Sequence, residues 1–166
     1  MDLSIVRHGI ALDVGEEGIQ SDFERKLSPK GIEKTGIIAK AFKKMEVNPG
    51  LILTSPLVRA RETAAIIAEE LKIQKNIKES DHLRPNADLH TCIQMLSNQK
   101  ERSIMVVGHI PCLPMLASLL LTKNFGTHIV LKKAGICGIS FEEKIQEGTG
   151  LLRMLLEPKQ LVLMTE

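Results

Sequence analysis

Three short apolar segments, each ending in charged or polar residues, constrain the fold of this chain most. Residues 3–6, 51–54 and 103–107 are the clearest of these segments, and a segment with helix signals follows each of them. Short apolar runs bounded by turn residues are typical of buried strands. Their alternation with helices predicts an α/β fold with a mainly parallel central sheet and helices on both of its faces.

Two Ser-Pro pairs mark expected helix starts. In Ser28-Pro29 and Ser55-Pro56 the serine suits the N-cap and the proline suits the first helical position. A third helix is expected over residues 88–96, and a fourth begins at Pro111. Mostly apolar side chains recur at helical spacing in three of these helices and predict the faces that pack on the sheet. These side chains are Ile38, Ala41, Phe42, Met45, Ala60, Thr63, Ala64, Ile67, Leu71, Leu113, Leu116, Ala117 and Leu120.

The remaining segments complete the predicted domain. Residues 135–141 and 151–156 read as two strands joined by a turn at 148–150, so the C-terminal part should add an antiparallel strand. Residues 11–26 are polar and contain glycine, which is typical of a surface loop with room to move. A length of 166 residues favours one domain over residues 1–166.

Unusual residues stand at the carboxyl ends of the three predicted strands, where parallel sheets bind ligands. The first strand runs into Arg7-His8-Gly9, the second into residues 55–59, which end in Arg59, and the third into Gly108-His109. If the strands are parallel neighbours, two arginines and two histidines meet in one pocket.

Four potential cations in one pocket require an anion, and a phosphoryl group suits them. The arginine fork matches two phosphate oxygens. The helix after Ser55 offers backbone N–H groups and a favourable dipole, and Gly9 allows the backbone to approach a ligand. A neutral imidazole can attack phosphorus, and neighbouring arginines disfavour its protonated form. One of the two histidines is therefore expected to be a nucleophile.

Four motifs in order resemble the histidine phosphatase superfamily, the phosphoglycerate mutase-like group. They are Val6-Arg7-His8-Gly9, residues 25–31, residues 55–60 with Thr63-Ala64, and residues 107–111. The resemblance covers roughly residues 3–115, and the small size is most similar to the phosphohistidine phosphatase (SixA) subgroup. It implies a three-layer α/β/α sandwich and a phosphatase that uses no metal and no cofactor.

The resemblance also implies roles for individual residues. His8 would take the phosphoryl group, and water would then hydrolyse the phosphohistidine. Arg7, Arg59 and His109 would bind the phosphate. The general acid stays open, because the family often has Glu or Asp where this chain has His82. His82, Asp81 or Asp88 could donate the proton, or no strong acid exists, since a P–N bond needs less help once its nitrogen is protonated.

The short length of the chain indicates which kind of substrate the pocket can accept. Larger members of the superfamily insert helices as a lid, for which residues 63–103 leave little room. An open pocket suits phosphohistidine displayed on a protein, because few remote contacts remain to hold a small molecule. Two alternatives stay open. The chain could be a phosphomonoesterase or mutase for a small phosphorylated metabolite, or a phosphate-binding module with little turnover.

Composition argues against other classes. The net charge is only +2 and the chain has neither Trp nor Tyr, so no nucleic-acid partner is expected. No run approaches the ~18 apolar residues of a membrane span, and Asp2, Arg7 and His8 interrupt the only early apolar run that could form a signal peptide. The three cysteines show no CxxC spacing. We therefore expect reduced thiols, a cytoplasmic location, and no metal site built from His8, His109 and a cysteine.

Overall fold

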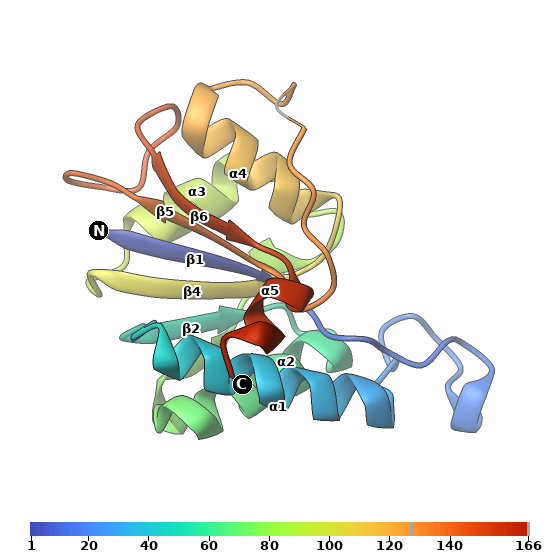
Figure 1. The fold of residues 1–166 in the computed structure, drawn as a ribbon. Helices are drawn as coiled ribbons and strands as arrows, with labels where there is room; N and C mark the ends of the chain where they lie inside the picture. Colours follow the sequence, from blue (N-terminus) through green and yellow to red (C-terminus); the bar gives the residue numbers. More distant parts are fainter. Residues whose placement is uncertain (127, 166) are drawn as a thin grey trace.

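A mixed six-stranded sheet forms the centre of the computed structural model, which describes residues 1–126 and 128–165. The strand order is β3-β2-β4-β1-β5-β6 (Figure 1). The pairs β2–β3, β2–β4 and β1–β4 are parallel, whereas β5 is antiparallel to both β1 and β6. This confirms the mainly parallel sheet with an antiparallel C-terminal strand. The strands are β1 (Asp2–Arg7), β2 (Leu51–Thr54), β3 (Ile77–Glu79), β4 (Ser103–Gly108), β5 (Ile136–Ser140) and β6 (Leu151–Leu156).

Helices cover both faces of the sheet, which makes the predicted three-layer sandwich. One face packs against α3 and α4, and the other against α1, α2 and α5, as Figure 1 shows. Short 3-10 turns, labelled η, join some of the elements. The helices are α1 (Pro29–Lys44), α2 (Val58–Leu71), α3 (Leu89–Ser97), α4 (Cys112–Thr122) and α5 (Pro158–Leu163), and the turns are η1 (Glu16–Gly18), η2 (Gln74–Asn76) and η3 (Asp81–Leu83).

The core follows the alternation of side chains along the strands. In β1, Leu3 and Ile5 pack toward α3 and α4, whereas Val6 packs on the opposite face. The stripes predicted for α1, α2 and α4 are buried, except that Met45 and Leu71 at the helix ends are only partly covered. Each fully buried aliphatic side chain contributes about 1.5–3 kcal/mol of transfer free energy.

Three local expectations differ from the structure. Ser55 does not cap α2, which begins at Val58 after the N-cap Leu57; the Ser55 hydroxyl is instead directed to His109. Neither β3 nor α5 was predicted. β3 has only three residues, too few to show a period. α5 carries a detectable signal, since Glu157 and Gln160 form a capping box around Pro158.

The register of the parallel strands brings the predicted motifs together. Arg7 pairs with Gly108, and Thr54 pairs with Val107, so β1, β4 and β2 end side by side. Helix α1 crosses close to the end of β1, because a Cβ on Gly31 would lie 2.0 Å from the carbonyl oxygen of Ile10. The turn after β1 is therefore fixed between the sheet and α1.

Candidate active site

His8 lies directly after β1 and is held by both its backbone and its ring. Its amide donates to the carbonyl of Gly108 at 3.0 Å. Its Nδ1 lies 2.7 Å from the carbonyl oxygen of Gly9. A carbonyl can only accept, so Nδ1 carries the proton in the neutral ring and the lone pair stands on Nε2. The turn after β1 thus selects one tautomer of a buried imidazole.

Arg59, in the first turn of α2, donates to that lone pair. Its Nε lies 3.3 Å from His8 Nε2, and the arginine is 4% exposed. Thr63, one turn later, ties the two segments together. Its hydroxyl accepts from the amide of Gly9 at 3.0 Å and donates to the carbonyl of Arg59 at 2.7 Å. Thr63 was expected in the buried stripe and in the second-helix motif but without a contact of its own, and its two hydrogen bonds show that it orients the site.

His109 follows β4, with its ring centroid 5.1 Å from that of His8. Its Nε2 lies 2.8 Å from the hydroxyl oxygen of Ser55. That oxygen also accepts from the amide of Leu57 at 3.4 Å, so the hydroxyl proton is available to His109 Nε2. The Nδ1 atom of His109 is buried and has no hydrogen-bond partner among the described residues. The second histidine therefore has one nitrogen fixed and one uncommitted.

Burial keeps both imidazoles neutral. Desolvation lowers the pKa of His8 to about 3, and the charges of His109, Arg59 and Arg7 add to this, partly offset by the hydrogen bond to Gly9. Desolvation also lowers the pKa of His109 to about 4, with Arg59 as the next cause. At neutral pH the site combines two uncharged imidazoles with two guanidinium groups, which can bind an anion and expose a nucleophilic nitrogen to it.

Arg7 is the last residue of β1 and directly precedes His8. Its Nη1 donates to the carbonyl of Leu131 at 3.1 Å, and its Nε is buried without a partner in the described part of the chain. Burial lowers the pKa of Arg7 from its usual value, and its charge disfavours protonation of both His8 and His109. The structure therefore brings His8, Arg59 and His109 together and places Arg7 near enough for its charge to act on both histidines.

Asp22 is the residue at this site that the sequence did not indicate. Two groups of Arg59 are bound to it, Nη1 to its carbonyl at 2.6 Å and Nη2 to its carboxylate at 3.0 Å. The next residue, Phe23, accepts from the amide of Val58 at 3.1 Å and lies under the guanidinium of Arg84. The loop expected to be open at the surface thus covers Arg59. The sequence of this loop, mainly acidic and polar up to Arg25 and Lys26, gave no sign of this contact.

The reason for a glycine at position 9 differs from the predicted one. A Cβ on Gly9 would lie 2.6 Å from the hydroxyl of Thr35 and 3.1 Å from a methyl of Leu27. The small residue is therefore required by packing against α1 and the segment before it. Its amide already donates to the Thr63 hydroxyl. This geometry therefore does not favour the expected close approach of a ligand to the Gly9 backbone.

The candidate general acids do not join the histidines. His82 lies in η3, which packs on the end of β4, but its ring forms no hydrogen bond or ion pair within residues 1–126 and 128–165. Asp81 accepts from Arg84 at 2.6 Å. Asp88 caps α3, and its bonds to the hydroxyl and amide of Thr91 lower its pKa. Both carboxylates are committed to local structure.

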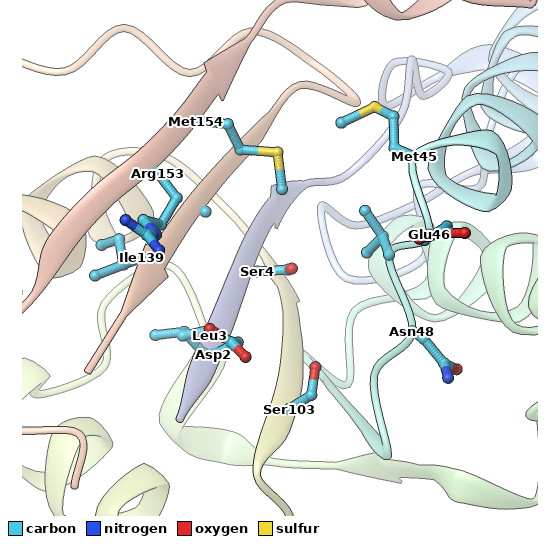
Figure 2. Close-up of a pocket in the computed structure, with 12 residues that line it drawn as sticks. Asp2, Leu3, Ser4, Met45, Glu46, Asn48, Ser103, Ile139, Arg153 and Met154 are labelled. Atoms are coloured by element: carbon cyan, nitrogen blue, oxygen red, sulfur yellow. The ribbon is translucent and has the colours of Figure 1, made fainter. Parts of the chain in front are cut away.

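Metal ligands do not gather in the described part of the chain, where no three His, Cys, Asp or Glu side chains are grouped. All three cysteines are free thiols, and burial raises the pKa of Cys92 to about 12. The cavity of about 320 Å³ in Figure 2 lies at the opposite end of the strands, beside the first residues of β1 and β4. Neither His nor Cys lines it. His8 and His109 lie at the carboxyl ends of β1 and β4, apart from this cavity.

Comparison with known proteins agrees with this geometry. Residues 3–84 match the family model of the histidine phosphatase superfamily (branch 1). The chain is 34% identical to an uncharacterized protein of Picosynechococcus, covering 98% of this chain and 99% of that protein. It is 26% identical to phosphohistidine phosphatase SixA of Escherichia coli, covering 95% and 94%.

The chain belongs to the histidine phosphatase superfamily. Within this superfamily it is SixA-like, and it is a phosphatase. A solved structure of the protein histidine phosphatase SixA with tungstate superimposes with a TM-score of 0.83 and 25% identity, covering 97% of this chain and 99% of that one. An alpha-ribazole phosphatase from Shigella flexneri shares the fold, with a TM-score of 0.75 and 18% identity over 95% and 97%. Among the described residues of this histidine phosphatase, no helix is long and apolar enough to span a membrane.

Proposed function

We propose that this phosphatase removes the phosphoryl group from phosphohistidine on proteins, through a phosphohistidine intermediate on His8. The observation that carries the proposal is the position of the His8 ring. Gly9 holds Nδ1–H, so the Nε2 lone pair faces Arg59 in a buried, uncharged imidazole. Such a ring is a competent nucleophile toward phosphorus without an activating base.

Two displacements complete the reaction. In the first, His8 Nε2 bonds to phosphorus while the P–N bond of the substrate breaks and the departing imidazole keeps a proton. In the second, water bonds to phosphorus, the bond to His8 breaks, and inorganic phosphate leaves. Arg7 and Arg59 neutralise the oxygens of the transferred group in both steps. No metal or cofactor is required in this scheme.

His109 contributes a hydrogen bond to the phosphoryl group. The Ser55 hydroxyl accepts from Leu57 and can give its own proton to His109 Nε2. The proton of a neutral His109 then resides on Nδ1, the buried nitrogen without a protein partner. A buried donor of this kind gains most when it meets a charged acceptor.

The choice of phosphohistidine rests on the leaving group and on the relatives. Asp22 is the carboxylate that reaches Arg59, and its bonds to Arg25 and Arg59 outweigh its desolvation and lower its pKa. A carboxylate held as the anion does not supply a proton, and His82 is not in contact with the histidines. An imidazole leaving group that carries its own proton suits such a site. The similarity to SixA over most of the chain points the same way.

Two alternatives each have an observation in their favour. The alpha-ribazole phosphatase shares the fold, so a small phosphorylated metabolite is the second candidate substrate. Asp22 occupies the Arg59 fork, so a phosphate-binding module with little turnover is the third reading. We further propose that residues 1–166 are one domain without a large lid, and that the free thiols belong to a protein of the cytoplasm.

A substrate panel tests the proposal. Phosphohistidine peptide, phosphoserine peptide and small phosphate monoesters would be offered to the wild type, His82→Ala and the control His90→Ala, which alters an exposed histidine paired with Glu147. We expect phosphohistidine to be turned over fastest, with His82→Ala and His90→Ala within about twofold of the wild type. Faster turnover of a monoester would support the metabolite reading, and binding without turnover would support the third.

A further inference from the structure

Arg7 forms the boundary of a second hollow, away from the His8 ring. This hollow of about 440 Å³ lies between the turn after β1, helix α1, the segment before β5 and the start of α5. We call it the basic hollow, because five of its six charged lining side chains are cationic. They are Arg7, Lys34, Lys132, Lys133 and Lys159, and the sixth is Glu157.

The positive charge of the basic hollow is only partly compensated. Lys132 pairs with Glu157 at 2.8 Å. Lys34, Lys133 and Lys159 form no ion pair with any described residue, although they come from three separate segments. Like charges gathered from distant parts of a chain repel one another, and a bound anion would relieve that repulsion.

The position of Arg7 connects the basic hollow to the reaction. Its charge reaches both histidines, while its Nη1 is held by Leu131 and its buried Nε has no partner among the described residues. A neighbouring hollow that Arg7 also borders has a mostly apolar lining that includes Met115, Phe125 and Val130, and it shares Lys132 with the basic hollow. Lys34, Lys133 and Lys159 line the basic hollow alone, so a substrate that extends from His8 past Arg7 meets most of the lysines on that side.

We propose that the basic hollow binds a second anionic group of the substrate, a carboxylate or a phosphate, while the transferred phosphoryl group lies at His8. This inference rests on the proposed function of the His8 site. On a protein substrate the second group would be an acidic side chain near the phosphohistidine. On a small metabolite it would be a second acidic group of the same molecule. In both cases the lysines select among substrates and take no part in bond breaking.

Charge reversal at the basic hollow tests the inference. The double variant Lys133→Glu/Lys159→Glu would be compared with Lys40→Glu/Lys78→Glu, in which both lysines are exposed and lie outside the hollow. Four substrates would be used: phosphoimidazole, a phosphohistidine peptide flanked by Asp, the same peptide flanked by Asn, and 3-phosphoglycerate. Binding of the fluorescently labelled peptides would be measured in parallel, which requires no turnover.

We expect the wild type and the control to prefer the Asp peptide over the Asn peptide by about tenfold in kcat/KM, and to lose the preference at about 0.5 M salt. The Lys133→Glu/Lys159→Glu variant should show no preference between the two peptides and an unchanged kcat/KM for phosphoimidazole.

An effect of the lysine substitutions on 3-phosphoglycerate alone would assign the hollow to a small metabolite. The inference would be overturned if the wild type had the same kcat/KM for both peptides and if the lysine substitutions left kcat/KM for 3-phosphoglycerate unchanged. Failure to hydrolyse phosphoimidazole would count against the proposed function, and the binding measurement would still decide on the hollow.

Discussion

Asp22 is bound twice to Arg59, through its carbonyl oxygen at 2.6 Å and through its carboxylate at 3.0 Å. The Arg59 side chain is buried, whereas that of Asp22 is 57% exposed. The Asp22 carboxylate is therefore in contact with solvent, whereas the Arg59 guanidinium is enclosed by protein. A phosphoryl group that uses the Arg59 fork has to displace this carboxylate, so Asp22 competes with phosphate for the same donors.

Replacing the competing carboxylate should strengthen phosphate binding. We expect Asp22→Asn to lower the inhibition constant of inorganic phosphate by about fivefold, a modest factor because the exposed side chain is screened by solvent. Asp13→Asn is the matched control, since Asp13 lies in the same loop and pairs with Arg25 but not with Arg59. An unchanged constant would contradict the competition, and a higher one would show that Asp22 helps to hold the anion.

Acid should destabilise the fold once the pH falls below the ordinary histidine pKa. The pKa values of His8 and His109 are lowered to about 3 and about 4, so the unfolded chain binds these protons first. Stability present at about pH 7 is lost as the pH falls below the ordinary histidine pKa, by about 2 kcal/mol per histidine at about pH 5. Urea unfolding at several pH values would measure this. His109→Gln should remove about half of the slope, and the exposed-site control His90→Gln should not; equal slopes in all three proteins would contradict the assignment.

The Ser55 hydroxyl should set the tautomer of His109. Ser55→Ala removes the partner of Nε2, and loss of a buried hydrogen bond of about 1–3 kcal/mol predicts a fall in kcat of about tenfold or more. Nitrogen NMR of the wild-type ring should report the proton on Nδ1, and a mixture of tautomers in Ser55→Ala. If the wild-type ring carries its proton on Nε2, Ser55 acts as an acceptor and this account of His109 is wrong.

Gly9 should be required for packing. Gly9→Ala would place a methyl group 2.6 Å from the Thr35 hydroxyl, and we expect a loss of about 1–3 kcal/mol in unfolding free energy. The double variant Gly9→Ala/Thr35→Ala should recover part of that loss, because the clash disappears with the hydroxyl. Strict additivity of the two substitutions would place the role of Gly9 elsewhere.

The site could be predicted from sequence where it depends on strand ends. Arg7, His8 and His109 are fixed by β1 and β4, and Arg59 lies in the first turn of the helix after β2, so recognising three strands was enough to bring them together. The contacts of Ser55 and Thr63 were missed because each residue also suits an ordinary local role, as a cap or in a helix stripe. Asp22 could not be found, since its position depends on how a polar loop folds back over α2, and no periodic pattern describes that.

The direct measurement is to trap the phosphoryl group on the protein. The wild type would be mixed rapidly with a radiolabelled phosphohistidine peptide, quenched in alkali and mapped by proteolysis. The account predicts an acid-labile label on the peptide that contains His8. In His8→Ala both the label and the turnover should be lost. A label on His109, or full turnover by His8→Ala, would contradict it.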